Sequence, residues 1–237
     1  MEEKLLHLLK AAQQAKESKN YDQAINLYEE ALRLPIQNDD KAMLFEFIGQ
    51  CYDRQEREHL AFENFGKAFE ADPEYENGWY LFYRYAELAY RFRQFNVSIE
   101  YLEKIVGQIP PDSENYIQYT RRLLGLNYLQ KKEHEKATLE FKKALKRSTN
   151  SKWKSHIYDG LAYSYFGLDK IGEAIKFGLK ALNEEFDEIV EERMFYLLAF
   201  CYGMWGIHQN SKKEQYYTEL LKKKYPNSAY LRELQLS

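Results

Sequence analysis

The chain has 237 residues, with 34 Lys and Arg against 37 Asp and Glu, which gives a formal net charge of −3. This balance argues against a nucleic-acid-binding protein, because such proteins need a basic surface to displace phosphate counterions. Only 11 Gly and 5 Pro are present, too few for the many turns of an all-β domain. The 21 Tyr, 14 Phe and 3 Trp argue against a disordered chain, because they can bury enough apolar area to offset the entropy lost on ordering.

Hydropathy and cysteine content argue against membrane-spanning, secreted and disulfide- or zinc-stabilised proteins. The sequence has no apolar run of the roughly 20 residues that a membrane span needs, and the longest run, Met194 to Trp205, predicts a buried helix. Two acids precede the short N-terminal apolar run, which makes a poor secretory signal, so we expect a cytoplasmic protein. Cys51 and Cys201 are far apart and neither belongs to a C-x-x-C motif, so no disulfide framework or zinc ribbon is predicted.

A spaced pattern of small and aromatic residues recurs along the chain, and its sixth copy departs from the pattern after Tyr202. Each copy predicts two amphipathic helices joined by a tight turn. The clearest copy reads Phe45-x-x-Ile48-Gly49-x-x-Tyr52, then Ala61-x-x-x-Phe65-x-x-Ala68 and Pro73. In chain order the copies lie near residues 5–38, 39–75, 76–111, 113–149, 151–186 and 187–226, and residues 228–237 are predicted to form a capping helix.

Small residues in each copy let its two helices approach closely, and the second follows the first by 12 positions in copies one to five. Extra residues fall at every junction between copies, which predicts that the first helix of copies two to six is one turn longer at its N-terminus. The N-caps predicted for these helices are Asp39, Ser113, Ser151 and Asp187.

The pattern resembles the tetratricopeptide repeat (TPR), W-x-x-L-G-x-x-Y followed by A-x-x-x-F, A and P. The resemblance covers nearly the whole chain, in six copies that keep the same register. It implies an all-α fold, a right-handed superhelical α-solenoid of antiparallel helix pairs, with residues 1–237 forming a single array. It also implies a protein-interaction module, because solenoids of this kind present extended binding surfaces.

Motifs for chemistry are missing from the sequence. It contains no G-x-G-x-x-G, P-loop, G-x-S-x-G or H-E-x-x-H motif. The five histidines are scattered without the spacing of metal ligands. We therefore expect no catalytic residues, no cofactor and no metal.

Candidate binding residues come from the first helix of each copy, whose positions outside the packing signature face the concave groove of a TPR array. Counted from the small residue, these positions lie six and three before it, and one and four after it. Aromatic and arginine side chains are enriched there, as in protein-recognition surfaces. The alternative is that the tyrosines only pack neighbouring helices. The predicted site residues are Tyr80, Tyr83, Glu87, Tyr90, Tyr119, Arg122, His156, Tyr163, Arg193 and Tyr196.

The two-carboxylate clamp by which some TPR proteins bind chaperone C-termini is absent, since Leu9, Gln13 and Phe47 stand where that family has Lys and Asn. We expect a scaffold that binds a protein or peptide segment with apolar or aromatic anchors and some negative charge. A second hypothesis is a sensor of a small signalling peptide, because long, Tyr-rich repeats resemble the peptide-pheromone receptors of Gram-positive bacteria. A third is self-assembly through the end repeats. The chain is predicted to be a monomer or weak homo-oligomer that binds no nucleic acid and has no membrane span.

Overall fold

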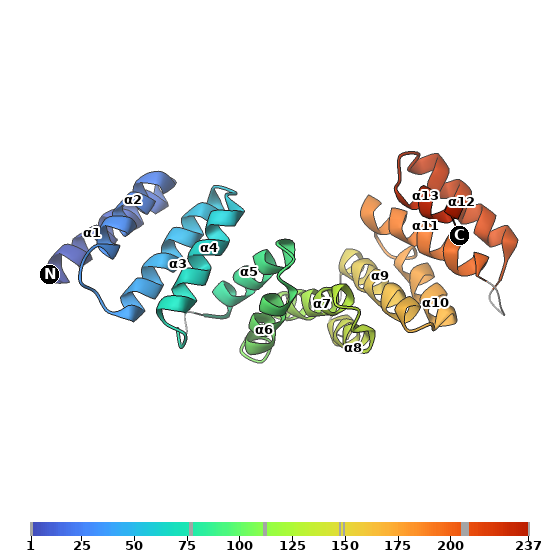
Figure 1. Cartoon of the computed structure of the whole chain (residues 1–237), viewed down its shortest axis with the longest axis horizontal. Coiled ribbons are helices and arrows are strands. Elements are labelled where there is room, and N and C mark those ends of the chain that lie inside the picture. Colours follow the sequence, from blue (N-terminus) through green and yellow to red (C-terminus); the bar gives the residue numbers. More distant parts are fainter. Residues whose placement is uncertain are drawn as a thin grey trace. The chain divides into compact units, whose positions relative to one another are not determined.

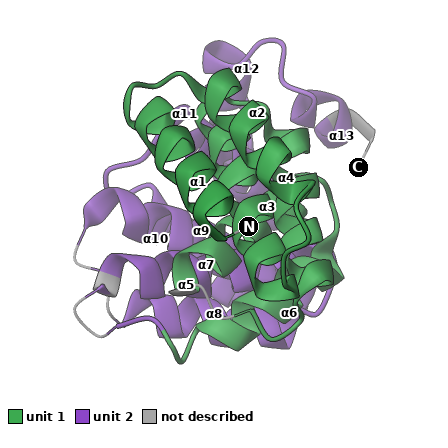
Figure 2. Ribbon diagram, turned by 90° about the vertical axis from the view of Figure 1, so that its left-hand side faces the viewer, with its two compact units in different colours: residues 1–108 green, residues 109–237 purple. Residues whose placement is uncertain are grey.

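The computed structural model describes residues 2–75, 78–110, 113–146, 148, 150–204 and 209–236. In these ranges every regular element is an α-helix (Figure 1). Two compact units are present, residues 1–108 and residues 109–237 (Figure 2). Unit 1 contains α1 (Glu2–Glu17), α2 (Tyr21–Leu32), α3 (Asn38–Arg54), α4 (Glu58–Ala71), α5 (Gly78–Arg91) and α6 (Phe95–Ile105). Unit 2 contains α7 (Glu114–Gln130), α8 (His134–Leu145), α9 (Ser151–Gly167), α10 (Ile171–Ala181), α11 (Glu188–Gly203), α12 (Ser211–Lys224) and α13 (Tyr230–Leu236).

The helices form pairs, each with an A helix (α1, α3, α5, α7, α9 or α11) followed by a B helix. In five of the pairs the A and B helices are joined by three residues, the second of which has a positive φ. The amide of the third joining residue closes the turn by donating to a carbonyl of the A helix five residues earlier, as in Gln94 N–H to Ala89 O at 2.8 Å. The positive-φ residue lies seven positions after the small A-helix residue every time: Lys19, Glu56, Arg93, Lys132 and Asp169. The turn thus occurs at the same position of the sequence pattern in each of these five repeats.

Close approach between A and B helices depends on the predicted small residues. The Ser98 hydroxyl donates to the Ala86 carbonyl at 2.7 Å, which joins the two small positions of one pair directly. Phe141 of α8 is fully buried and lies against two glycines, Gly125 of its own pair and Gly160 of the next. A Cβ at Gly160 would lie 2.3 Å from the Phe141 ring, so only glycine fits there.

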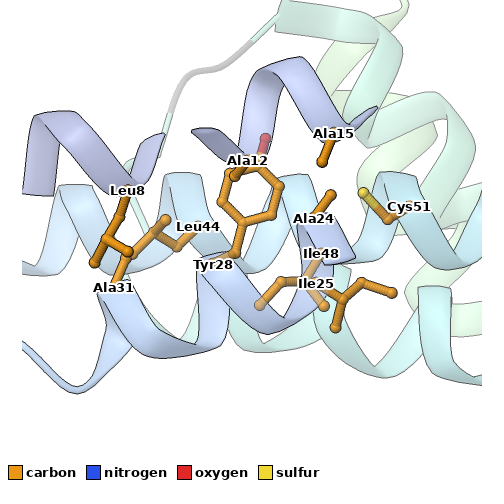
Figure 3. Close-up of a cluster of buried hydrophobic side chains, with 10 residues drawn as sticks. All are labelled: Leu8, Ala12, Ala15, Ala24, Ile25, Tyr28, Ala31, Leu44, Ile48 and Cys51. Atoms are coloured by element: carbon orange, nitrogen blue, oxygen red, sulfur yellow. The ribbon is translucent and has the colours of Figure 1, made fainter. Parts of the chain in front are cut away.

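The hydrophobic core runs between neighbouring helices of each unit. In unit 1, side chains from α1, α2 and α3 form one buried cluster (Figure 3), and the Tyr28 ring at its centre is 1% exposed. The cluster holds Leu8, Ala12, Ala15, Ala24, Ile25, Tyr28, Ala31, Leu44, Ile48 and Cys51. Cys51 and Cys201 are both buried free thiols, and burial raises the pKa of each, to about 11 for Cys51 and about 12 for Cys201. Both cysteines therefore act as packing residues.

The starts of the A helices agree with the sequence only in part. Helices α3, α7, α9 and α11 begin eleven residues before their small residue, but α1 begins ten before Ala12, so the long start is not confined to later repeats. The described α5 begins at Gly78, eight residues before Ala86, and residues 76 and 77 lie outside the described ranges. The extra turn predicted for the third repeat is therefore not present in the described part of α5.

The predicted N-caps are also only partly correct. Asp187 caps α11, with its carboxylate accepting from the Val190 amide at 3.1 Å. Ser113 is the N-cap of α7 but makes no side-chain capping bond. The predictions of Asp39 and Ser151 are wrong. Helix α3 begins at Asn38, so its N-cap is Gln37. Helix α9 begins at Ser151 itself, so its N-cap is Asn150. Asn150 is the effective cap of α9, accepting from the Trp153 amide at 3.1 Å.

Candidate functional site

Within the described ranges, no helix combines the length and apolarity needed to cross a bilayer. The same ranges contain no group of three or more His, Cys, Asp or Glu side chains arranged to hold a metal ion. Cavities lie along the A helices of each unit.

Unit 1 has a cavity of about 490 Å³ at the A helices of its three repeats. Tyr80 is 49% exposed at this cavity, as expected for a groove residue. Tyr83 is half-buried on the same helix, and Tyr90 packs on Phe95 with ring centroids 5.9 Å apart. Tyr90 therefore contributes to packing within its own helix pair. The cavity is lined by Lys16, Glu17, Lys19, Tyr21, Gln50, Asp53, Arg54, Phe65, Tyr80, Leu81 and Arg84.

The predicted residue Glu87 is hydrogen-bonded to Arg84, which also binds Asp53 of the neighbouring repeat. The Arg84 guanidinium donates to Glu87 at 2.5 Å and in a two-pronged arrangement to Asp53 at 2.6 and 3.0 Å. Burial would lower the pKa of Arg84, but the hydrogen bonds that it donates to both carboxylates outweigh this effect and raise that pKa above its usual range. Sequence position alone did not select Arg84, which lies two residues before the small residue Ala86.

A polar chain crosses from α1 to α3 beside this cavity. The Lys16 ammonium donates to Gln50 at 2.9 Å, and the Gln50 amide donates to the buried Glu46 at 2.7 Å. The Tyr75 hydroxyl donates to the other oxygen of Glu46, also at 2.7 Å. Both oxygens of this buried carboxylate thus have a donor, which offsets the cost of its desolvation.

In unit 2 the A helices lie side by side, with α9 in contact with α7 and α11, and α11 in contact with α13. The predicted residues Tyr119 and Arg122 of α7 both meet Trp153 of α9. The Tyr119 ring centroid is 4.4 Å from that of Trp153, and the Arg122 guanidinium lies 5.4 Å from the same ring. Such stacks combine apolar contact with a cation–π attraction.

His156 of α9 faces the N-terminus of α11. Its Nε2 lies 3.0 Å from the Asp187 carboxylate, the group that also caps α11. Burial and the nearby Arg122 charge lower the pKa of His156, although Asp187 acts in the opposite sense. His156 therefore stays neutral at physiological pH and its contact with Asp187 is a hydrogen bond between a neutral ring and a carboxylate.

Three more predicted residues, Tyr163, Arg193 and Tyr196, meet at a cavity of about 430 Å³ between α9, α11 and α13. The Arg193 guanidinium lies 4.5 Å from the Tyr163 ring centroid and 3.3 Å from Asp159. Tyr196 stacks on Tyr230 of α13, with centroids 4.6 Å apart and planes 18° apart. We call this space the unit 2 cavity; it is lined by Gln130, Tyr163, Phe166, Arg193, Tyr196, Leu197, Phe200, Tyr230 and Glu233.

Asp159 is the buried acid of this site, only 3% exposed. Burial raises the pKa of Asp159 to about 6, against opposing effects of Arg193 and then Arg122. Burial likewise raises the pKa of Tyr163 far above its ordinary value, so its hydroxyl stays protonated. Aromatic side chains and Arg193 thus line the cavity, and Asp159, the acid that pairs with Arg193, holds its proton more strongly than an ordinary Asp.

The structure thus brings six of the ten predicted residues together in unit 2 and places Tyr80, Tyr83, Glu87 and Tyr90 in unit 1. Asp159 and Phe166 occupy groove positions by the same counting rule, three before and four after Ala162. Trp153 and Tyr230 do not, because one lies a turn further toward the start of α9 and the other belongs to the capping helix. The only signal for them in the sequence is their aromatic character.

The fold of this chain is that of TPR proteins. PilF from Pseudomonas aeruginosa superimposes with a TM-score of 0.62 at 16% identity, over 99% of this chain and 98% of that protein. PilW, a type IV pilus biogenesis factor, gives 0.61 at 17% identity, over 98% of both chains. YrrB, a TPR protein with an unusual peptide-binding site, gives 0.62 at 17% identity, over 74% of this chain and 84% of its own.

Comparison by sequence finds no match. No protein-family model matches the chain, and no curated protein matches it. At 16–17% identity the structural matches establish the fold, an all-α solenoid of TPR helix pairs.

Proposed function

We propose that the chain is a non-catalytic interaction scaffold that binds a peptide segment of a protein partner along the A helices of unit 2. The observation that carries the proposal is the unit 2 cavity, in which five aromatic side chains and Arg193 line about 430 Å³. Aromatic and arginine side chains dominate binding energy at protein interfaces, because they give large contact areas with polar tips. The peptide-binding site described for YrrB, a chain of the same fold, supports the same reading.

The ligand suited to this cavity is an extended segment with one large apolar or aromatic anchor. The cavity volume is in the range that accommodates a side chain and its flanking backbone, and its walls Phe166, Leu197 and Phe200 are apolar. The neighbouring Tyr119, Trp153 and Arg122 stack extends the aromatic surface along α7 and α9. A segment that lies across these helices would contact both groups.

The test is selection of peptides from a displayed random library on the full chain, followed by fluorescence polarisation with a selected peptide. Tyr196→Ala should weaken binding about tenfold or more, because it removes a wall of the cavity. Tyr216→Ala is the matched control, since Tyr216 is 56% exposed on α12 and is not among the residues that line the cavity. Helical circular dichroism should be the same for both variants.

Two results would contradict the proposal. One is a library that yields no peptide with measurable affinity for the full chain. The other is a selected peptide that binds Tyr196→Ala as tightly as the unmodified chain, or that loses as much affinity with Tyr216→Ala.

A further inference from the structure

Asp159 carries a buried negative charge that its surroundings satisfy only in part. Its Oδ2 atom lies 3.3 Å from a terminal nitrogen of Arg193, while its Oδ1 atom is buried and has no hydrogen-bond partner among the described residues. A carboxylate that lacks donors in a desolvated setting is costly to keep ionised. Its negative charge therefore depends on the electrostatic field of the nearby arginines.

The contrast with Glu46 shows that this arrangement is not general to the fold. Glu46 and Asp159 occupy the same place in their repeats, three residues before Gly49 and Ala162, and are 4% and 3% exposed. Gln50 and Tyr75 each donate to one oxygen of Glu46. Among the described residues, Asp159 has no such pair of donors. The second repeat thus has a fully satisfied buried acid where the fifth has one held mainly by an ion pair.

Arg193 connects this acid to the unit 2 cavity. Its side chain is 28% exposed, lies on the Tyr163 ring and lines the cavity. Asp159 is the acid to which it is ion-paired. The guanidinium therefore faces a site for ligand on one side and a titratable counter-ion on the other. An acidic ligand group at Arg193 would share its charge with Asp159 and repel that carboxylate.

We infer that Arg193 binds an acidic side chain of the partner peptide, and that Asp159 is its internal counter-ion, which weakens this binding until it takes up a proton. The inference rests on the proposed function, since it assigns a ligand chemistry to the same cavity. The cavity then selects a peptide segment that places an apolar side chain against Phe200 and a neighbouring Glu or Asp side chain at Arg193.

Linkage gives the direction of the pH effect. The pKa of Asp159 is raised to about 6 by burial, so the group is ionised at about pH 8 and mostly protonated at about pH 5.5. A bound carboxylate raises that pKa further, and each added unit corresponds to about tenfold tighter binding in the protonated form. Affinity for an acidic peptide should therefore increase as pH falls through this range.

Other charged and titratable groups face Asp159, and their effects on the pH dependence must be distinguished from its own. Arg122 of α7 acts in the same sense as Arg193, and Asp187 at the start of α11 acts against both. Glu233 of α13 is exposed at the cavity and hydrogen-bonded by Tyr196, so solvent screens its charge. The charges that act on Asp159 are those of Arg193, Arg122 and Asp187, and the hydroxyls of Tyr163 and Tyr230 also face it. His156, which contacts Asp187, is the remaining titratable group, and burial lowers its pKa.

The experiment uses two blocked dipeptides as probes, N-acetyl-Phe-Glu-amide and its uncharged analogue N-acetyl-Phe-Gln-amide. Each is titrated into the full chain at about pH 5.5 and about pH 8, and binding is followed by NMR shifts of the arginine side-chain N–H groups. For the Glu probe, the unmodified chain should bind about tenfold more tightly at the lower pH. Asp159→Asn should bind it with the higher affinity at both pH values, and the Gln probe should show no pH dependence.

Two further variants complete the test. Arg193→Gln should lose the preference for the Glu probe over the Gln probe. His156→Gln should keep the full pH dependence, because the inference assigns that dependence to Asp159. The inference is overturned if Asp159→Asn binds the Glu probe no more tightly than the unmodified chain at about pH 8, if His156→Gln abolishes the pH effect, or if neither probe binds.

Failure here is distinguishable from failure of the proposed function. Peptides selected from the library that lose affinity with Tyr196→Ala but lack acidic residues would overturn this inference alone. Binding of the Glu probe at Arg193, together with a library that yields no peptide, would count against the peptide-binding scaffold and leave the anion site standing.

Discussion

At the scale of the residue, Asp159 shows how one buried group can link pH to both binding and stability. Its folded-state pKa of about 6 lies above its ordinary value of 3.8. The folded chain therefore holds this proton more strongly than the unfolded chain does. The contribution of Asp159 to the free energy of unfolding therefore falls as pH rises from about 4 through about 6, because the folded state loses a proton that it had bound preferentially.

Replacing Asp159 by Asn removes this dependence. The stability difference between Asp159→Asn and the unmodified chain should shift in favour of the variant by about 2 kcal/mol between about pH 4.5 and about pH 8. Urea denaturation followed by circular dichroism at the two pH values measures it. Glu133→Gln is the sign control, because hydrogen bonds from Lys136 and Lys131 lower the pKa of Glu133. Its stability difference should therefore not shift in favour of the variant over the same range, and a constant difference for Asp159→Asn would contradict the assignment.

The site could be predicted from the sequence only as a set of positions. Counting from the small residue points to Tyr163, Arg193 and Tyr196, which the structure places at the unit 2 cavity, because helical periodicity determines which face of the A helix a side chain occupies. It does not reveal that Arg84 binds both Asp53 and Glu87, or that Tyr90 packs on Phe95. Those outcomes depend on how far each side chain reaches toward other helices, as from Arg84 to Asp53, which lies 31 residues earlier in the sequence.

At the scale of the element, the turns between A and B helices share an unusual backbone. Residues Lys19, Glu56, Arg93, Lys132 and Asp169 all have φ between 57° and 61°, and none of them is glycine. Left-handed backbone costs a residue with a Cβ roughly 1 kcal/mol or more. The turns persist because the helix pair on either side, held by buried apolar contacts, outweighs this local cost.

Lys132→Gly should therefore stabilise the chain, by about 0.5–1 kcal/mol, since glycine adopts this backbone without steric penalty. Lys131→Gly is the matched control: this exposed neighbour has φ of −84°, where glycine brings an entropic cost and the 3.2 Å ion pair with Glu133 is lost, so it should destabilise. Thermal unfolding of both variants measures the difference. Equal destabilisation by the two substitutions would contradict the interpretation of the turn.

At the scale of the whole molecule, the described helices divide into two units that each hold three A–B pairs. In a solenoid each repeat depends mainly on its neighbours, so about three repeats can form an independently stable core. Unit 2 also has α13 at its end, where Tyr230 covers Tyr196. The array of residues 1–237 as one continuous body stays a prediction from the repeat register.

A fragment of residues 109–237 should fold by itself, with helical circular dichroism and a cooperative thermal transition. Its matched control is residues 109–226, which lacks α13 and should melt several degrees lower, because the last A helix loses its cover. A disordered 109–237 fragment that becomes helical only when residues 1–108 are added would show that the two units fold as one.

The sequence by itself determined the helix pairs, their register and the faces that they bury, because small and aromatic residues at fixed spacing allow only one way for neighbouring helices to pack. It also determined the absence of known catalytic motifs. The tertiary structure alone decided which groove residues meet: Asp159 with Arg193, Tyr196 with Tyr230, and Trp153 with both Tyr119 and Arg122. The physical reason is that periodicity is a local property of one helix, whereas the desolvation and pairing of a charge depend on side chains from several helices at once.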